Sequence, residues 1–332
     1  MDKIAVLTSG GDAPGMNPAI RAVVRTAIYY DIEIVGVKRG YSGLIEGDFY
    51  TMNRGSVADI IHRGGTILHS ARCEEFKTEE GQKKALKRLK DNSIEGLIVI
   101  GGDGSFRGAQ VLAKKYNFPT VGIPGTIDND LACTDYTLGF DTAMNTILDA
   151  INKIRDTATS HERTFVVETM GRHSGFLTLR TGLAGGAESI LIPEIDFTID
   201  DICEKIKHGY DRGKLHSIIL VAEGIGDDFK TNRDINESKA FSIGKKIKEK
   251  TGLETRVIIL GHLQRGGSPT AMDRILASRM GAEAVKLLKD GQSNKMVGFV
   301  NNDIKTCDLD EALSREKEID EDILDLAHIL SL

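Results

Sequence analysis

The stretch that decides the predicted fold is Thr120-Val121-Gly122-Ile123-Pro124-Gly125-Thr126-Ile127-Asp128-Asn129-Asp130. Residues 120–123 form an apolar run of the kind that makes a short buried strand in a parallel sheet. Asp128 and Asp130 follow a Pro-Gly turn, so we expect them at the carboxyl end of that strand, where open α/β sheets bind their ligands. One carboxylate is a candidate to take a proton from a substrate hydroxyl while the other helps to hold a metal ion. The alternative is an acidic surface loop, so the interpretation depends on partners elsewhere in the chain.

Strand-like apolar runs alternate with helical patterns along the whole chain. In the first half, strands are expected at residues 3–8, 33–38, 96–100 and 120–123, and helices at 18–30 (with Asn17 as its cap), 56–62, 79–90 and 106–116. In the second half, strands are expected at residues 164–169, 189–192, 217–222 and 256–260, and helices at 142–159, 175–183, 198–210 and 237–250. A helix at 268–288, a strand at 296–300 and a charged helical tail at 309–332 complete the pattern. Such alternation predicts two α/β halves with parallel, doubly wound sheets and right-handed crossovers.

The composition excludes several classes of protein. Hydrophobic residues make up 40% and charged residues 28%, which is ordinary for a soluble globular chain of 332 residues. A net charge of −6 disfavours a dedicated nucleic-acid binder. The four cysteines (Cys73, Cys133, Cys203 and Cys307) lack the spacing of a zinc site or a disulfide framework. No apolar run approaches the ~20 residues needed to cross a bilayer, and no signal peptide precedes the first strand, so we expect a cytoplasmic protein with no membrane contact.

Two glycine-rich turns follow predicted strands and precede predicted helices. They are Ser9-Gly10-Gly11-Asp12 and Gly101-Gly102-Asp103-Gly104-Ser105. Glycines let backbone N–H groups approach a phosphate, and the helix N-terminus beyond the turn adds partial positive charge. Neither turn is a P-loop or a dinucleotide fingerprint, and each by itself is also compatible with an ordinary tight turn. Asp103 is more informative, because a carboxylate beside a phosphate would repel it unless Mg²⁺ lay between them.

Positive charge comes from arginines dispersed along the chain: Arg72, Arg163, Arg172, Arg256 and Arg265. The guanidinium group binds phosphate bidentately, and phosphoryl transfer depends mainly on positioning and charge neutralisation. Any one of these arginines is alternatively a solvated surface charge, and His262 is alternatively a core histidine. Together with the glycine turns and the acidic pair, they favour phosphoryl transfer from a magnesium nucleotide to a sugar-like hydroxyl.

Five motifs resemble those of the phosphofructokinase family, in its ATP-dependent bacterial form, and they occur in the family's order. They are residues 8–17 (Thr-Ser-Gly-Gly-Asp-Ala-Pro-Gly-Met-Asn), 101–105, 124–130, 170–172 (Met-Gly-Arg) and 261–269 (Gly-His-Leu-Gln-Arg-Gly-Gly-Ser-Pro). The resemblance covers nearly the whole chain. Gly-Gly-Asp-Gly alone also occurs in NAD kinases and lipid kinases, so the specificity comes from the five motifs together.

The resemblance implies two doubly wound α/β domains with mostly parallel sheets and an active site in the cleft between them. A nucleotide-binding domain would comprise residues 1–138 and about 263–313. A sugar-phosphate-binding domain would comprise residues 139–262 and about 314–332. The family also forms a homotetramer in which neighbouring subunits share active and effector sites.

The resemblance assigns roles to particular positions. Asp128 would accept the proton of the sugar's 1-hydroxyl, with Thr126, Asp130 and Arg172 as its catalytic neighbours. ATP would be bound by Gly11, Arg72, Cys73, Gly102, Asp103, Gly104 and Ser105, with Asp103 binding Mg²⁺. Fructose 6-phosphate would be bound by Thr126, Ile127, Asp128, Met170, Gly171, Arg172, Glu223, His262, Leu263, Gln264 and Arg265, and by Arg163 and Arg256 of a neighbouring subunit.

The resemblance also bears on the phosphoryl donor. In relatives that use pyrophosphate, the positions of Gly104 and Gly125 carry an aspartate and a lysine, so the glycines here favour ATP. The implied products are fructose 1,6-bisphosphate and ADP, formed at the committed step of glycolysis. The alternatives are a pyrophosphate-dependent enzyme, a catalytically silent nucleotide sensor and a non-enzymatic scaffold. The intact Asp103, Asp128 and Asp130 weigh against the sensor.

A second basic set matches the family's effector pocket. Arg21 and Arg25 are four residues apart and therefore share one helix face. The other members are Arg54, Asp59, Arg155, Gly186, Ala187, Glu188, Arg212, Lys214, Leu215 and His216. The resemblance implies activation by ADP and inhibition by phosphoenolpyruvate, through a shift of the tetramer between two states. Gly55 and Leu215 depart from the family's pattern, so no effector affinity is implied.

Overall fold

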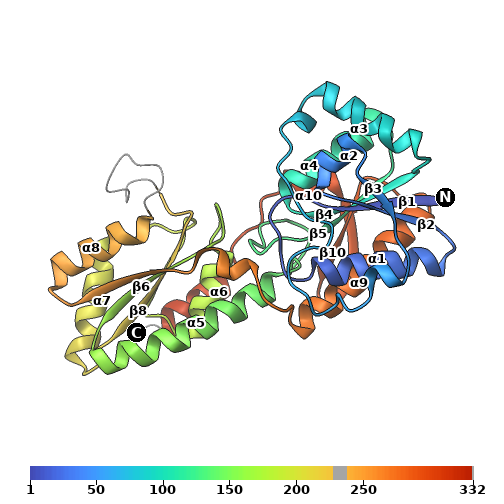
Figure 1. Ribbon diagram of the computed structural model, residues 1–332. Helices are drawn as coiled ribbons and strands as arrows, with labels where there is room; N and C mark the ends of the chain where they lie inside the picture. The colour runs from blue at the N-terminus through green and yellow to red at the C-terminus, as the bar shows by residue number, and fades with distance from the viewer. Residues whose placement is uncertain (227–237, 331–332) are drawn as a thin grey trace. The chain divides into compact units, whose positions relative to one another are not determined.

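The computed structural model describes residues 1–226 and 238–330. The chain divides into two compact units, which Figure 1 shows as ribbons. The first unit contains Met1–Thr142 and Arg265–Lys317, and the second contains Ala143–Gln264 and Glu318–Leu332. The nucleotide and sugar-phosphate roles expected for the two parts of the chain stay predictions.

A mostly parallel sheet forms the centre of the first unit. Its strands are β1 (Lys3–Thr8), β2 (Glu33–Val37), β3 (Phe49–Thr51), β4 (Gly96–Gly101), β5 (Thr120–Pro124), β10 (Lys295–Val300) and β11 (Asp303–Asp308), in the order β11-β10-β5-β4-β1-β2-β3. The edge strands β3 and β11 are antiparallel to their neighbours, and the other pairs are parallel. The expected return of the C-terminal strand to the first unit is confirmed, because β10 pairs with β5.

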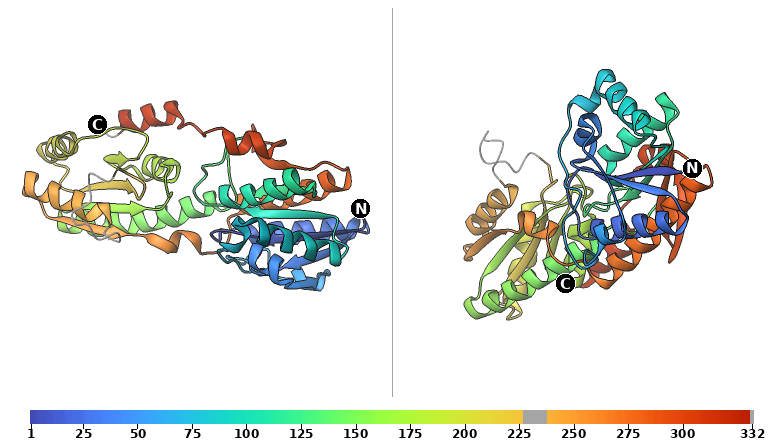
Figure 2. Two further views of the ribbon diagram at one scale, coloured as in Figure 1. Left: turned by 90° about the horizontal axis from the view of Figure 1, so that it is seen from above. Right: turned by 45° about the vertical axis from the view of Figure 1, so that its right-hand side comes forward.

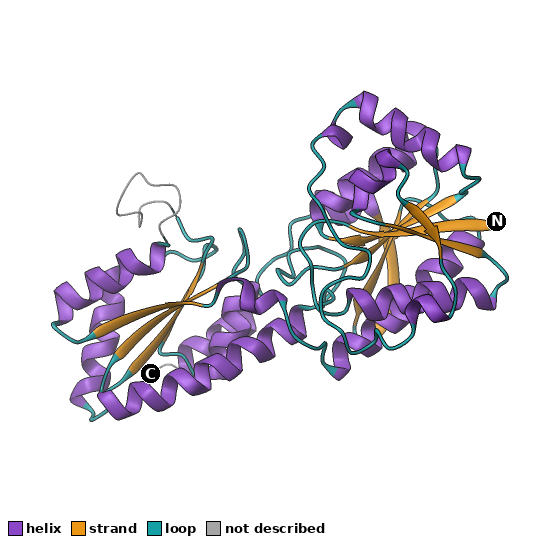
Figure 3. Cartoon of the chain, viewed as in Figure 1, coloured by secondary structure: helices purple, strands orange, loops and turns teal. Residues whose placement is uncertain are grey.

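Helices cover both faces of this sheet, as a doubly wound fold requires (Figures 1 and 3). α1 (Met16–Tyr29) and α9 (Ala271–Lys289) pack against each other on one face. α2 (Gly40–Glu46), α3 (Glu79–Asp91) and α4 (Asp103–Tyr116) lie on the other face. The short helices η1 (Gly55–Val57), η2 (Glu75–Lys77) and α10 (Leu309–Ser314) complete the unit. Side chains such as Leu7, Val99 and Phe106 are fully buried between the sheet and α4.

The second unit has an all-parallel sheet. Its strands are β6 (Thr164–Thr169), β7 (Ser189–Leu191), β8 (Ser217–Ala222) and β9 (Thr255–Ile259), in the order β7-β8-β6-β9. Its helices are α5 (Phe140–His161), α6 (Phe176–Gly185), α7 (Ile199–Asp211), α8 (Lys239–Thr251), η4 (Gly261–Arg265) and α11 (Glu321–Leu330). α7 packs against α8, and α11 packs against α6. α5, green in Figure 2, begins in the first unit and continues into the second without a break.

The structure corrects several local expectations. Asn17 does not cap α1, which Gly15 precedes; its side chain instead receives a hydrogen bond from Ile67 N (2.8 Å) and donates to Arg63 O and Gly64 O. The helix expected at residues 56–62 is only the three-residue η1, and the tail forms α10 and α11 rather than one helix. The expected start of a helix at Glu237 lies outside the described residues.

Four elements of the first unit, among them the three-residue η2, were not expected from the sequence. α2 contains two glycines, which have low helix propensity, so its sequence does not read as a helix. β3 is only three residues long. β11 (Asp-Ile-Lys-Thr-Cys-Asp) carries charges because it is an exposed edge strand, and such charges mask the pattern of a strand.

Candidate functional site

The turns that follow β1, β4 and β5 meet at one edge of the first sheet. These strands are neighbours, and their carboxyl ends point the same way. Ser9 N donates to Ile100 O (3.0 Å), and Gly125 N donates to Gly101 O (2.9 Å). The buried Ser105 side chain lies against both glycine turns, since a Cβ on Gly10 would be 3.3 Å from its Oγ and one on Gly101 would be 2.6 Å from it. The first unit therefore brings the two glycine turns and the acidic stretch together.

Asp103 occupies the first turn of α4 rather than a loop. Arg107 donates two hydrogen bonds to its carboxylate, from Nε to Oδ2 (2.8 Å) and from Nη2 to Oδ1 (3.0 Å). These bonds raise the pKa of Arg107. The Asp103 side chain is 36% exposed, and nothing lies within 4 Å of a Cβ built on Gly104. The start of α4 is therefore an open position with a carboxylate at the N-terminus of a helix.

Residues 125–139, which we call the acidic loop, form a closed structure after β5. Leu138 N donates to Pro124 O (2.8 Å), and Thr137 Oγ1 donates to Thr126 O (2.5 Å). Asn129 accepts from Thr137 N (2.9 Å) and donates to Asp135 O (3.0 Å). These hydrogen bonds join residues of the loop to one another and to the end of β5, so its side chains have fixed positions.

Asp128 lies inside the acidic loop and is 7% exposed. Its backbone N donates to Thr126 Oγ1 (3.2 Å). A Cβ on Gly102 would lie 3.5 Å from the Thr126 Cβ, so the acidic loop and the turn that begins α4 are in close proximity. Ile127 is fully buried and anchors the loop, whereas Asp130 is half-buried.

Arg265 contacts the first glycine turn. Its Nη1 donates to Asp12 O (3.2 Å), and a Cβ on Gly11 would lie only 2.2 Å from that nitrogen. Glycine at position 11 therefore leaves room for the guanidinium group of Arg265. The sequence placed Arg265 with the sugar-phosphate residues and did not indicate this contact.

The segment that contains Arg72 and Cys73 lies beside the same turn. Thr8 Oγ1 donates to His69 O (2.9 Å), and Ser70 Oγ donates to Gly10 O (2.5 Å). Arg72 is exposed two residues further on, and Cys73 packs against the core of the first unit.

In the second unit, the turn after β6 is organised by neighbouring strand ends. Arg172 has a positive φ of 57°, and its backbone N donates to Glu223 Oε1 (2.7 Å) just after β8. Met170 N donates to the fully buried Gln264 Oε1 (3.1 Å), after β9. Gly171, at φ 144°, lets the chain turn between these two contacts. Residues 170–172, Glu223 and Gln264 are therefore together, as the resemblance implied.

Arg163 and Arg256 lie side by side on adjacent strand ends and share one acidic partner. Arg163 Nε is 2.9 Å from Glu254 Oε2, and Arg256 also pairs with Glu254. Hydrogen bonding from Arg163 first, and the two positive charges, lower the pKa of the Glu254 carboxyl. His262 and Leu263, in η4, are exposed. Two arginines that share one carboxylate can exchange that carboxylate for an anionic ligand.

The expected effector residues of the second unit also form a cluster. Lys214 pairs with Glu188, whose other oxygen accepts from Ile218 N (2.5 Å). Arg155 donates to Gly185 O (2.5 Å) and Gly186 O (3.0 Å), next to the buried Ala187. Burial, and then the charges of Lys214 and Arg155, lower the pKa of His216, although Glu188 opposes this change. Leu215 is half-buried, and Arg212 follows α7 and donates to His208 O (3.3 Å).

The remaining effector residues belong to the first unit. Arg21 and Arg25 lie one turn apart on α1, which contacts η1. Arg54 directly precedes η1 and is exposed, and Asp59 follows it with a positive φ of 51°. These residues lie on or beside α1 and η1, two elements that contact each other.

Sequence reasoning missed three residues that build the first unit's site, Arg107, Thr137 and Asp273, and it gave Asn17 a different role. The i, i+4 spacing of Asp103 and Arg107 was visible and could have indicated their ion pair. Thr270 and Asp273 have the spacing of a helix cap, and Thr270 Oγ1 does accept from Asp273 N (3.2 Å). The partners of Asn17 and Thr137 follow from tertiary contacts and leave no local pattern.

A parallel sheet whose edge joins two glycine turns, a helix N-terminus and a buried acidic loop defines the class of α/β phosphotransferases.

None of the helices formed by residues 1–226 and 238–330 is long and apolar enough to cross a membrane. Within the same residues, no group of three or more His, Cys, Asp or Glu side chains is arranged to hold a metal ion.

The sequence profile of the family described as "Phosphofructokinase" matches residues 3–288. The chain belongs to the phosphofructokinase family, and it is a kinase whose acceptor is an alcohol group. It is 76% identical over 332 residues to the ATP-dependent 6-phosphofructokinase of Halothermothrix orenii, with 100% of both chains covered. It is 59% identical over 332 residues to the enzyme of the same name from Halalkalibacterium halodurans, again with 100% of both chains covered.

Solved structures agree with this fold. Pichia pastoris phosphofructokinase in the T-state has a TM-score of 0.88 and 36% identity, and the match covers 94% of this chain and 35% of that longer one. A pyrophosphate-dependent phosphofructokinase from Marinobacter aquaeolei has a TM-score of 0.84 over 99% of this chain and 91% of that one. At 22% identity, the second match shows the fold alone.

Proposed function

We propose that this enzyme transfers the γ-phosphoryl group of ATP to the 1-hydroxyl of fructose 6-phosphate, the committed step of glycolysis in the cytoplasm. The observation that carries the proposal is the meeting of the acidic loop with the turn that begins α4, where Gly102 approaches Thr126. Relatives that are 76% and 59% identical over their full length are named ATP-dependent 6-phosphofructokinases, which supports the choice of donor and acceptor.

Asp128 would act as the general base. It would take the proton of the 1-hydroxyl as that oxygen forms its bond to the γ-phosphorus, while the bond from this phosphorus to the β,γ-bridging oxygen breaks and ADP leaves. An ordinary aspartate has a pKa of ~3.9 and is a weak base, so proton transfer would contribute only ~10²–10⁴-fold. The remaining acceleration would come from charge stabilisation and positioning, to which Arg172, Thr126 and Asp130 would contribute.

The start of α4 fits a magnesium nucleotide. The helix N-terminus and the open space at Gly104 suit phosphates. The ATP site would be completed by Gly11, Arg72, Cys73, Gly102 and Ser105. The two oxygens of Asp103 keep lone pairs beyond those used by Arg107, so this carboxylate suits Mg²⁺ bound mainly through phosphates. The ion would neutralise phosphate charge and orient the γ-phosphoryl group.

Fructose 6-phosphate would be held by residues 170–172, Glu223, His262, Leu263, Gln264 and Arg265, together with Thr126 and Ile127. Arg163 and Arg256 would bind its 6-phosphate in a neighbouring subunit of a homotetramer. Their shared partner Glu254 supports this assignment, since both guanidinium groups pair with the same carboxylate.

The cationic cluster of Arg155, Lys214 and His216 would bind the phosphate of an effector, with Arg212, Gly186, Ala187 and Glu188 around it. Arg21, Arg25, Arg54 and Asp59 would contribute from the first unit. We propose ADP as activator and phosphoenolpyruvate as inhibitor. The Lys214–Glu188 pair supports a site that exchanges a carboxylate for an anionic ligand.

A coupled assay tests the proposal. The purified enzyme, Mg²⁺ and fructose 6-phosphate are mixed with ATP or with pyrophosphate, each with and without ADP or phosphoenolpyruvate. We expect turnover with ATP, little with pyrophosphate, and a phosphoenolpyruvate inhibition that ADP relieves. Turnover with pyrophosphate alone would reassign the donor, and no turnover with either would leave a nucleotide sensor. Rates unaffected by both effectors would remove the regulatory assignment.

A further inference from the structure

Asp273 is a buried carboxylate that the proposed reaction does not use. It lies in the first turn of α9 and is 1% exposed. Its Oδ1 accepts from Gly139 N (2.8 Å), and its Oδ2 accepts from Thr142 N (2.9 Å) and Thr142 Oγ1 (2.5 Å). All three groups donate to the carboxylate. The Thr142 hydroxyl oxygen accepts from Thr270 N (3.0 Å), so the hydroxyl proton is available to donate to Asp273. In its ionised form the Asp273 carboxylate therefore accepts from all three donors.

These bonds fasten the junction between the acidic loop and α5. Gly139 ends the loop, and the first N–H groups of α5 have no partner within the helix. The acidic loop is closed from Pro124 to Leu138, so fixing Gly139 fixes the base of the loop that carries Asp128. A second hydrogen bond, from Thr270 Oγ1 to Asp141 Oδ2 (2.5 Å), ties the same two helix starts together.

The turn after β1 meets the same junction. A Cβ on Gly139 would lie 2.8 Å from the Ala13 Cβ and 3.0 Å from Pro14 O. A Cβ on Gly15 would lie 3.4 Å from the Leu138 Cβ and 3.8 Å from the Asp273 Cβ. Both glycines have positive φ, at 98° and 107°. The atoms at this junction are closely packed, so a shift of Asp273 would move the acidic loop and the turn after β1 together.

We propose that Asp273 is a positioning residue for phosphoryl transfer: by accepting from Gly139 and Thr142 it sets the place of Asp128 relative to the turns of β1 and β4. This inference rests on the proposed function. A displacement of about 1 Å in a reacting group can cost ~10²-fold in rate, so the effect should appear in kcat rather than in substrate affinity.

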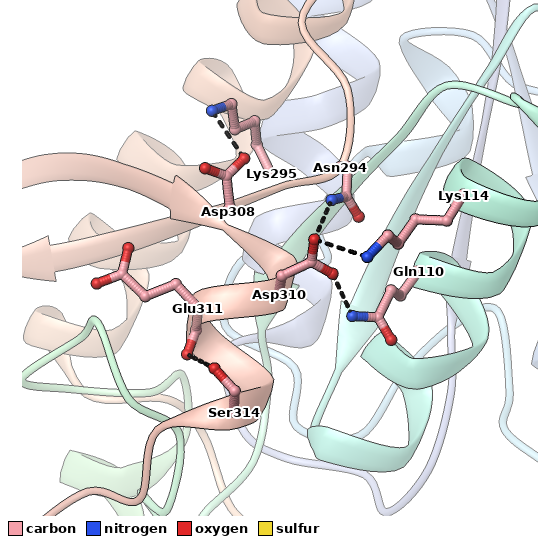
Figure 4. A network of polar contacts seen from close by, with 8 residues as sticks. All are labelled: Gln110, Lys114, Asn294, Lys295, Asp308, Asp310, Glu311 and Ser314. Atoms are coloured by element: carbon pink, nitrogen blue, oxygen red, sulfur yellow. Dashed lines mark hydrogen bonds and ion pairs between the residues drawn. The ribbon is translucent and has the colours of Figure 1, made fainter.

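The test compares Asp273→Asn with a matched control, Asp310→Asn. Asparagine would turn one acceptor of residue 273 into a donor that faces an N–H group. Asp310, drawn in Figure 4, also accepts several hydrogen bonds in the first unit, from Gln110 (2.5 Å), Lys114 (3.0 Å) and Asn294 (3.5 Å), but it joins α10 to the far end of α4. We expect Asp273→Asn to lower kcat at least about tenfold, with both KM values changed less than threefold, and Asp310→Asn to keep the wild-type kcat.

Thr142 provides a second pair of variants should Asp273→Asn fail to fold. Thr142→Val removes the hydroxyl donor, whereas Thr142→Ser retains it, so kcat should fall in the first and be rescued in the second. Equal kcat values for Val and Ser, a wild-type kcat in folded Asp273→Asn, or an equal loss in Asp310→Asn would each overturn the inference. A wild-type enzyme without turnover would instead contradict the proposed function itself.

Discussion

Asp128 is the residue on which the chemistry depends. We predict that Asp128→Asn lowers kcat by about 10²–10⁴-fold, because the amide cannot take the hydroxyl proton, while the KM for fructose 6-phosphate stays within about twofold. Asparagine has the same shape, and the loop around it is held by Thr137 and Asn129, so binding should survive. Steady-state kinetics with saturating ATP measure both values. An unchanged kcat would remove Asp128 from the role of base.

Gly11 is predicted to serve Arg265 as well as the nucleotide. In Gly11→Ala the methyl group would collide with the guanidinium, which would have to leave Asp12 O. Losing one charge-assisted hydrogen bond of about 1.5 kcal/mol corresponds to a roughly tenfold rise in the KM for fructose 6-phosphate.

The matched control for this variant is Gly104→Ala, where a new methyl would meet no protein atom within 4 Å. That variant should change the KM for ATP and leave the sugar's KM alone. If Gly11→Ala also affected only the KM for ATP, its contact with Arg265 would have no function.

Asp273 should also make the stability of the protein depend on pH. Burial raises its pKa to about 6 from an ordinary 3.8, with the Thr142 and Gly139 hydrogen bonds opposing and the nearby Asp141 charge adding to the rise. Between these pH values the folded protein keeps a proton that the unfolded chain has lost. The stability due to Asp273 is therefore full below pH 3.8 and is lost as the pH rises through 6.

Comparing wild type with Asp273→Asn isolates this term, because the variant has no carboxyl group to titrate there. The free energy of unfolding of the wild type minus that of Asp273→Asn should fall by about 2 kcal/mol as the pH rises from 4.5 to 7.5. Urea unfolding at the two pH values provides the measurement, and parallel pH dependences of the two proteins would show that the carboxyl group is not shifted.

At the scale of elements, Asp310 joins α10 to the C-terminal half of α4 (Figure 4). Its side chain is 43% exposed, so we predict that Asp310→Asn lowers the free energy of unfolding by only about 1 kcal/mol. Asp103 lies at the opposite end of α4, and kcat should not change. Thermal unfolding with kinetics on the same sample checks both points; a large loss of activity would mean that α10 positions the nucleotide helix.

The elements were predictable to different degrees. Residues 3–8, 164–169 and 217–222 form the strands expected of them, because a fully buried parallel strand is a continuous apolar run. α2 and β11 were not predicted, because glycines weaken the helical pattern of α2 and charges interrupt the strand pattern of β11. α4 begins earlier than its periodicity suggested, because Asp103 joins its first turn through Arg107.

At the scale of the whole molecule, the proposed homotetramer, with active sites shared between neighbouring subunits, predicts complementation between subunits. Asp128→Asn and Arg256→Ala tetramers should each be nearly inactive. If Arg256 serves the neighbouring subunit's site, mixed tetramers formed by dissociation and reassociation will contain some sites with both wild-type residues. Activity above that of either parent is the expected result. A mixture no more active than its parents would place both residues in one subunit's site or leave the tetramer unsupported.

The α/β alternation, the glycine turns, the acidic loop and the family could all be predicted from the amino-acid sequence, because they are properties of neighbouring residues and of motifs in order. Three contacts became visible only in the folded protein: Asn17 holds residues 63–67, Arg265 fills the space at Gly11, and Asp273 caps α5. The reason is physical. A hydrogen bond between residues far apart in the chain depends on sheet order and crossover geometry, and the sequence around either partner contains no pattern that indicates the other.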